Sequence, residues 1–394
     1  MIYGICIKNF DVFDDDRLGI LIDENEDAFR LRGLNALIGR NNTGKSSFIN
    51  SMSFIKDTVI GGAAEAATMR GRPGFYKMLI DTEQPAEFSV FFKIKDPDKK
   101  ESRYLQYDLK IKAGIFKSPQ IAYEKITRSV KNDDDTYRLE VVMELEEGRG
   151  TVCGKSTTIN DEHLTALGVY GKIAEYEEIS MIYHEISTWF FCKFSSDEHG
   201  TYQNQNYFAE GNAPGGHKHL NSHGTNLDNV LEYMKSVDED YYNKSIGEIR
   251  SLIPVMKKKK NLPDNLTESP DRLFLYLLML RDMDPKSTIF IEAPDKDLYH
   301  DMVDVLANEF REFTIRNRYS QIVFSTHNPY IVETMSPKEI WVFTRTFLRD
   351  DGDVSIRCAA DDPLVRELFE QGVGMGAIWY GGHLDEHTGF EDEN

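Results

Sequence analysis

The sequence predicts an α/β fold with a mainly parallel core sheet, an antiparallel β lobe and a helical insertion. Three observations lead to this prediction. A glycine-rich segment at residues 39–46 lies between a short apolar run and a helical pattern, residues 87–144 contain successive strand patterns, and strand and helix patterns alternate from about residue 271 onward. Strands that alternate with helices are typical of a parallel sheet covered by helices on both faces.

The first sixty residues contain two strand patterns and one helix pattern. Residues 2–13 alternate apolar and polar side chains and predict an edge-type strand. Residues 32–38 form a short apolar run that suits a buried parallel strand. After the glycine-rich segment, Phe48, Met52 and Ile55 recur at helical spacing.

The middle of the chain contains the predicted lobe and insertion. Charged turns separate the strand patterns of 87–144, as in an antiparallel meander, and we place the lobe at 85–145. Residues 146–261 form the helical and loop insertion: 166–186 has helical spacing, and 195–224 is polar, rich in glycine and asparagine, and expected to be a long loop.

The last third alternates clearly between helix and strand. The expected helices are 271–283 and 298–318, and the expected strands are 287–293, 321–326, 339–347 and 353–359. Together, 1–60 and 262–394 are expected to form the core of one domain that spans 1–394. Sustained heptads are absent, so no coiled coil is predicted.

Composition restricts the partners and the compartment. The formal net charge of −20 argues against a protein that coats nucleic acid with its whole surface, although a local basic patch would be compatible with it. The one dense basic run, Lys257 to Lys260, is expected to be a solvated loop or helix end. Four scattered cysteines, no apolar run of membrane-spanning length and no secretory pattern predict a cytoplasmic protein with no membrane contact.

The glycine-rich segment has the chemistry of a phosphate cradle. Gly39 to Ser46 fit the pattern G-x-x-x-x-G-K-[ST] at every defined position. Glycines allow successive N–H groups to point at phosphate oxygens, the lysine reaches the β- and γ-phosphates, and the serine hydroxyl binds Mg²⁺. We therefore expect ATP and Mg²⁺ as cofactors. The expected nucleotide-binding residues of this segment are Gly39, Arg40, Asn41, Asn42, Thr43, Gly44, Lys45, Ser46 and Ser47.

Two later strands end in residues suited to the same site. Glu292 ends the strand at 287–293 and is placed to hold Mg²⁺ together with Ser46, as P-loop enzymes require of a neighbouring strand. His327 follows the strand at 321–326. Ligands bind at the carboxyl ends of parallel strands, so we expect His327 on the same rim as a sensor of the γ-phosphate.

Together these motifs resemble the ATP-binding-cassette (ABC) ATPases of the SMC/Rad50/OLD type, especially the compact prokaryotic AAA-15/AAA-21 group, over nearly the whole chain. IKNFDVFDD resembles the family's opening motif, GRNNTGKSS its Walker A, IFIEAPDKDL its Walker B region and FSTHNPYIVETM its switch-histidine motif. HGTNLDNVLEYM and GVGMGAIWYGGHL are weaker matches that fall in the family's order. The resemblance implies an ABC-ATPase head.

The chain departs from this family at the general base. Relatives place a second glutamate after the magnesium-binding acid, whereas this chain has Ala293. A general base contributes about 10²–10⁴ in rate, so hydrolysis is expected to be slow unless another group substitutes. Asp295 and His327 are the candidate substitutes.

The resemblance also implies a signature loop that contacts the γ-phosphate across a dimer. The best match is residues 266–273, where Ser269 replaces a family glycine and Arg272 is the most credible functional residue. The family's Q-loop glutamine corresponds to either Gln84 or Gln106.

By analogy with the family, we expect two heads to associate around ATP and Mg²⁺ as a homo-oligomer, and hydrolysis to release them. Stand-alone heads of this type often serve bacterial anti-phage defence, where a phage-derived trigger switches a separate nuclease or toxin; the PARIS sensor ATPase is one example. The alternatives are a DNA-binding repair or recombination ATPase of the OLD type, a nucleotide-locked scaffold without turnover and, least favoured, a transporter motor.

A histidine group offers a further possible site. His217, His219 and His223 have spacing compatible with a metal site but lie in a polar loop without nearby cysteines. We expect this loop to face a partner or a trigger instead of binding a metal.

Overall fold

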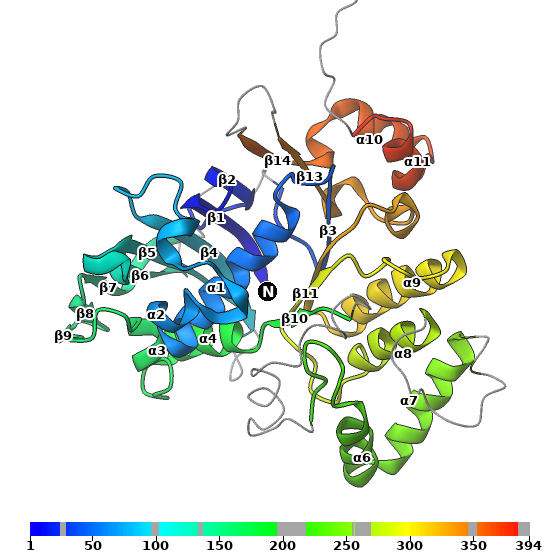
Figure 1. The fold of residues 1–394 in the computed structure, drawn as a ribbon, viewed down its shortest axis with the longest axis horizontal. Helices are drawn as coiled ribbons and strands as arrows, with labels where there is room; N and C mark the ends of the chain where they lie inside the picture. Colours follow the sequence, from blue (N-terminus) through cyan, green and yellow to red (C-terminus); the bar gives the residue numbers. More distant parts are fainter. Residues whose placement is uncertain are drawn as a thin grey trace, which may run out of the picture.

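The computed structural model describes residues 1–23, 29–95, 102–132, 137–194, 218–253, 256, 269–345 and 353–384. Within these ranges the strands form two sheets of different kinds, one antiparallel and one mainly parallel. Helix α1 (Lys45–Gly61) lies between them with α4 (Glu177–Ser187) packed beside it, and most of the other long helices cover the far side of the parallel sheet (Figure 1).

The parallel sheet is the core that the sequence predicts. Its strand order is β10-β11-β12-β3-β13-β14, and only the β13–β14 pair is antiparallel. Its strands are β3 (Leu34–Ile38), β10 (Phe190–Cys192), β11 (Thr288–Glu292), β12 (Gln321–Ser325), β13 (Ile340–Arg345) and β14 (Val354–Cys358). The predicted strands of the last third are therefore confirmed, and the sheet gains β10 from the segment assigned to the insertion.

The antiparallel sheet is larger than the predicted lobe. Its order is β2-β1-β4-β5-β6-β7-β8-β9, so it takes strands from both sides of residues 85–145. Its strands are β1 (Ile2–Phe10), β2 (Phe13–Gly19), β4 (Ala86–Lys95), β5 (Ser102–Ala113), β6 (Pro119–Lys131), β7 (Tyr137–Glu146), β8 (Arg149–Val152) and β9 (Lys155–Thr158). The predicted meander corresponds to β4 through β7, and the sheet continues beyond it through β1 and β2 on one side and β8 and β9 on the other.

The first strand corrects the sequence analysis. β1 pairs with β2 on one side and β4 on the other, so it is an interior strand, and the edge-type prediction was wrong. Its alternation is weak in the structure because most of its residues are buried, polar ones included. Alternation of apolar and polar residues therefore does not show that one face of the sheet is exposed to solvent, because here both faces of β1 are packed.

Helices cover both faces of the core sheet. On one face Leu37 and Phe343 pack against α1, and the rings of Phe48 and Phe343 lie 6.2 Å apart. On the other face alternate residues such as Ala36 and Ile38 join a second cluster. The helices of that cluster are α6 (Leu227–Val237), α7 (Glu239–Leu252), α8 (Ser269–Met279), α9 (His300–Arg316), α10 (Pro363–Glu370) and α11 (Met375–Tyr380).

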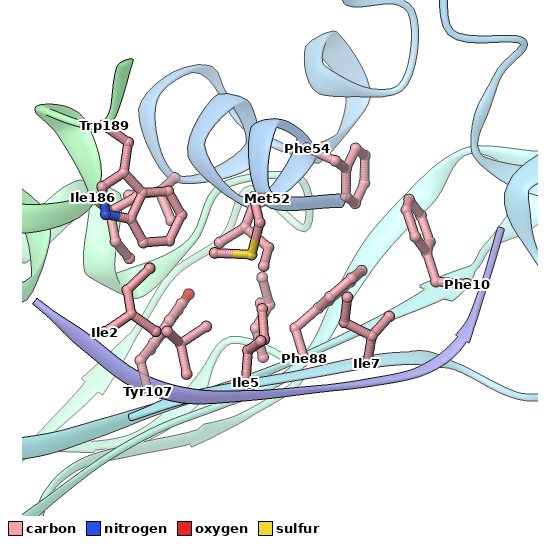
Figure 2. Packing of buried hydrophobic residues seen from close by; sticks show 14 of the residues in the cluster. Ile2, Ile5, Ile7, Phe10, Met52, Phe54, Phe88, Tyr107, Ile186 and Trp189 are labelled. Carbon is pink, nitrogen blue, oxygen red and sulfur yellow. The ribbon is translucent and has the colours of Figure 1, made fainter. Parts of the chain in front are cut away.

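Helix α1 is held against the antiparallel sheet as well. Figure 2 shows Met52 and Phe54 of α1 above the side chains of β1, and the rings of Phe10 and Phe54 stack 4.9 Å apart. Trp189, which follows α4 (Glu177–Ser187), packs at the other end of the same cluster. The helix that follows the phosphate cradle is therefore clamped between two sheets.

The described helices are short. The longest, α1 and α9, each have 17 residues, and no coiled coil is evident in the described ranges. No helix among them combines the length and the apolar character that a bilayer crossing requires.

A buried carboxyl group joins the lobe to α3 (Ala166–Tyr170). Glu124 of β6 accepts hydrogen bonds from the Tyr107 hydroxyl at 2.8 Å and from the backbone N–H groups of Ala166 and Leu167. Burial raises the pKa of Glu124 to about 7, although these hydrogen bonds partly oppose the shift. The folded state therefore holds this proton more tightly than the unfolded chain does.

This shift predicts how stability depends on pH. The contribution of Glu124 is fully present below the unfolded pKa near 4.5 and is lost as pH rises through about 7, a change of about 3 kcal/mol. Urea unfolding of wild type and Glu124→Gln at pH 5 and pH 8 should show the wild type losing about that much stability relative to the variant. Parallel pH dependence in the two proteins would contradict the assignment.

Candidate functional site

The phosphate cradle connects the carboxyl end of β3 to the start of α1. Gly39 and Gly44 have φ values of 139° and 101°, and Asn42 has 62°. A Cβ atom at Gly39 would lie 2.1 Å from the carbonyl oxygen of Phe343, so only glycine fits there. The turn therefore depends on the glycines of the motif, as the sequence predicts.

The turn between β1 and β2 supports the cradle from outside. A Cβ atom at Gly44 would lie 3.2 Å from Val12 and 3.4 Å from the Phe13 ring. Arg345, at the end of β13, donates to the carbonyl oxygen of Asn42 at 3.4 Å. The sequence analysis did not include these residues in the site, because nothing local in the sequence brings them to the cradle.

Lys45 is folded back into the cradle. Its Nζ atom donates to the carbonyl oxygens of Gly39 at 2.8 Å and Arg40 at 2.6 Å, and lies 3.4 Å from the Thr43 hydroxyl. Burial lowers the pKa of Lys45 to about 8. A cation held by neutral oxygens inside a glycine turn is poised to exchange these partners for phosphate oxygens.

The residues predicted to bind magnesium meet directly. The Ser46 hydroxyl donates to Glu292 Oε1 at the end of β11, and both groups are accessible from the rim. The other carboxylate oxygen of Glu292 lies 3.7 Å from Nζ of Lys193, which directly follows β10. Lys193 was missed by the sequence analysis, because the three residues of β10 were assigned to the insertion.

The position after Glu292 has an unusual backbone. Ala293 has a φ of 44°, and its N–H donates to both the carbonyl and the hydroxyl oxygens of Ser325, each at 3.1 Å. These bonds fasten the end of β11 to the end of β12. An alanine has no group that could activate water, so a base must come from elsewhere on this rim.

Asp295 lies close behind Ala293. Its Oδ1 atom accepts a hydrogen bond from the Thr326 hydroxyl at 2.7 Å. Burial raises the pKa of Asp295, although the Thr326 bond partly opposes this effect. A carboxylate with a raised pKa is a stronger base than a solvated one, so the chemistry of Asp295 suits the role of substitute base.

His327 follows Thr326 on the same rim and is exposed. Burial of part of the ring and the nearby charge of Lys45 lower the pKa of His327. Because β12 pairs with β3, the imidazole after β12 lies on the rim that carries the cradle, and the lowered pKa favours the neutral ring.

This shift gives a test of the predicted sensor role of His327. Protonation should occur only below the ordinary value near 6.5, so kcat/KM should stay level through neutral pH and decline as pH falls below that value. Replacement by glutamine, His327→Gln, should lower kcat/KM about 100-fold and leave only the part of this decline that protonation of Asp295 contributes. An unchanged rate and an unchanged acid limb in the variant would exclude the role.

The signature residues lie differently from the expectation. Arg272, in the first turn of α8, is buried, and its guanidinium pairs with Asp297 of the same chain at 2.7 Å. It is therefore not displayed for a neighbouring head in this conformation. Ser269 begins α8, and the rest of the signature match at 266–268 lies outside the described residues.

The two candidates for the Q-loop glutamine, Gln84 and Gln106, lie in different surroundings. Gln106 is buried within β5, where it accepts from the Ile22 N–H and donates to Asp108. Gln84 is exposed in the loop before β4, and its carbonyl oxygen accepts from Asn9 at the end of β1. The bonds of Gln106 are those of a structural residue.

The histidine group does not assemble a metal site in the part of the chain that is described. His219 pairs with Asp282 at 2.6 Å, while His217, the run Lys257 to Lys260 and most of the polar loop lie outside the described residues. No group of three potential metal-binding side chains occurs among the described residues.

The residues present fit ATP with Mg²⁺. The cradle is too narrow at Gly39 for any side chain, its lysine is held by exchangeable carbonyl oxygens, and a hydroxyl and a carboxylate adjoin it. Oxygen atoms of this kind are the ligands that Mg²⁺ prefers. Lys45, Ser46 and Glu292 would hold the two cofactors, with Asp295 and His327 on the same rim.

Comparison with known families supports this interpretation. Residues 271–333 match the family model described as "AAA domain, putative AbiEii toxin, Type IV TA system". The matched segment contains Glu292, Asp295 and His327. Together with the cradle, this match supports the assignment of the chain as a P-loop ATPase of the ABC type. No curated protein matches the sequence significantly.

Solved structures with a similar arrangement include heads of SMC proteins. The SMC head domain from Thermotoga maritima is 14% identical with a TM-score of 0.44, and the match covers 91% of this chain and 98% of that one. An SmcHead bound to the C-winged helix domain of ScpA is 11% identical with a TM-score of 0.44, and the match covers 91% and 99%.

Proposed function

We propose that this chain is an ATP-driven switch: two copies associate head to head around ATP and Mg²⁺, and their association controls a separate effector, a nuclease or toxin, in anti-phage defence. The observation that carries the ATPase part is the hydrogen bond between the Ser46 hydroxyl and Glu292. It joins the cradle, which follows β3, to the end of β11, and β12 lies between these two strands. The defence part rests on the family resemblance.

Each residue of the rim has a separable task in this proposal. Lys45 leaves the carbonyl oxygens of Gly39 and Arg40 and neutralises charge on the phosphates. Ser46 and Glu292 hold the metal, which when bound supplies positive charge to the phosphate oxygens. Asp295 accepts the proton of the attacking water, and His327 donates a hydrogen bond toward the γ-phosphate.

The exposure of the rim supports association of two heads. Ser46 and His327 are exposed. At the position where the family has its catalytic glutamate, Ala293 provides no group that could act as a base. A second copy that covers this rim would exclude water and contribute groups to the site. Arg272 would have to leave Asp297 to take part, so the switch would include a change in the first turn of α8.

The effector part has one further support. The description of the matching family names a toxin of a type IV toxin–antitoxin system, and a system of that name has two components. We propose that a separate effector protein binds differently to the associated and to the separated heads. A phage product shifts the equilibrium between these two states.

The experiment that tests this proposal measures ATP turnover and sedimentation over a wide range of protein concentration. Turnover per chain should rise with concentration, and a dimer should appear with ATP and Mg²⁺ and disappear when the nucleotide is removed. Turnover per chain that is independent of concentration, from a species that stays monomeric with ATP, would exclude the switch. Stimulation by DNA would favour the OLD-type alternative.

A further inference from the structure

An open pocket of about 680 Å³ lies at the amino-terminal edge of the core sheet. Its walls come from the start of β3, the end of α9 and the segment before β13. It is lined by Met1, Arg32, Gly33, Leu34, Thr314, Arg318, Ser336, Lys338 and Glu339. Because β3 starts here and ends at the cradle, this pocket and the ATP site occupy opposite edges of one sheet.

Three of the lining side chains are cations: Arg32, Arg318 and Lys338. Among the described residues none of the three forms an ion pair with a carboxylate. Other cations of the chain differ, because Arg128 and Arg281 each pair with two carboxylates. A single exposed lysine or arginine would need no explanation, whereas three that line one pocket create a local positive potential.

The one acidic residue among the lining side chains does not neutralise these cations. Both oxygens of Glu339 accept hydrogen bonds from Arg311, and Ser336 donates to the same carboxylate through its N–H and its hydroxyl. Although burial alone would raise the pKa of Glu339, these bonds hold it below its ordinary value. The charge of Glu339 is therefore balanced by Arg311, so no described carboxylate that lines the pocket offsets the three cations.

The thiol of Cys358 lies within the electrostatic range of two of these cations. Burial raises the pKa of Cys358 to about 12 and the charge of Asp361 adds to the shift, while the charges of Arg32 and Lys338 oppose it. The α-amino group of Met1 adds little charge to the pocket, because it pairs with Glu185 at 2.8 Å. Among the described lining residues, the net positive charge of the pocket thus comes from the two arginines and the lysine.

We propose that this pocket binds a small anion with two or more phosphate groups. One phosphate group carries about two negative charges at most, which would leave part of a triple positive charge unmatched. The volume lies in the range of small-molecule sites, which is about 300–1,000 Å³. Arginine forks bind phosphate oxygens in pairs, and Arg32 and Arg318 flank the pocket from the start of β3 and from the end of α9.

The test uses the full chain with the cradle disabled by Lys45→Ala, so that phosphate binding at the ATP site does not contribute. Calorimetric titration with sodium tripolyphosphate at low salt should still show binding. When Arg318→Ala and Lys338→Ala are both added to the Lys45→Ala protein, the affinity for tripolyphosphate should fall at least about 10-fold. The reason is that the ligand loses one charge-assisted contact with each cation removed. The matched control adds Arg366→Ala and Lys235→Ala, two exposed cations on α10 and α6, and should leave the affinity unchanged.

Several results would overturn the proposal. Binding that disappears in Lys45→Ala alone would assign all phosphate binding to the cradle, and binding that survives loss of both pocket cations would place it elsewhere. Equal weakening by the control pair would indicate general attraction to basic residues. Duplex or single-stranded DNA that binds the same residues more tightly than tripolyphosphate would assign the pocket to nucleic acid. None of these results depends on ATP turnover, so the ATPase proposal is tested separately.

Discussion

Replacing Lys45 by alanine should abolish ATP turnover, with a loss of at least about 100-fold in kcat/KM, and should weaken ATP binding in the same protein. The amine of Lys45 lies within the cradle, held by carbonyl oxygens of Gly39 and Arg40. A preorganised charge in a partly water-excluded site is worth about 3–4 kcal/mol to a transition state. Turnover assays and a fluorescent-nucleotide titration would measure the two effects.

The control for this prediction is Lys235→Ala, which removes an exposed lysine from α6. Its rate and affinity should match those of wild type. Because Lys45 is buried against neutral groups and its pKa is lowered to about 8, the alanine variant should fold at least as well as wild type. A Lys45→Ala protein that keeps wild-type turnover would show that the cradle is not the catalytic site.

Replacing Ala293 by glutamate should accelerate hydrolysis, with the usual contribution of a general base, about 10²–10⁴, as the upper limit because Asp295 already supplies a slower base. The substitution suits the backbone, because Ala293 already holds a φ of 44° with a Cβ atom in place and its N–H is fixed by Ser325. The new carboxylate would project from the rim beside Glu292. Single-turnover measurement with excess protein would separate hydrolysis from product release.

The matched variant for this prediction is Ala293→Gln, which adds the same bulk without a base. It should show no acceleration. If Asp295 provides the slow wild-type rate, Asp295→Asn should lower turnover in wild type but should have little effect in the Ala293→Glu background. Equal rates for wild type, Ala293→Glu and Ala293→Gln would mean that proton abstraction does not limit turnover.

The parts of the site that could be predicted from the sequence are those coded locally. Lys45 and Ser46 belong to a continuous motif, and Glu292 can be found because it ends an apolar strand downstream of that motif. Their meeting follows from one topological rule, that parallel strands bring their carboxyl ends to one edge. In the structure the Ser46 hydroxyl donates to Glu292, and the metal-binding role of the two residues stays a prediction.

The supporting residues could not be predicted in the same way. Val12 and Phe13 reach the cradle from the antiparallel sheet, and Lys193 reaches Glu292 from the end of a strand of three residues. Their positions depend on how two sheets pack across α1, and this packing leaves no periodic signal in the sequence. The burial of Arg272 was unforeseen for a related reason, because its partner lies 25 residues further along the chain.

The central position of β3 has a consequence for how the chain acquires its fold during synthesis. β3 precedes the cradle near the start of the chain, yet its two neighbours are β12 and β13, with Leu34 opposite Ile322 and Ala36 opposite Ile340. The antiparallel sheet can close once β9 has emerged, whereas β3 waits for the last quarter of the polypeptide. Pairing over such separations is slow. During synthesis β3 therefore stays without its sheet partners until β12 and β13 have been made.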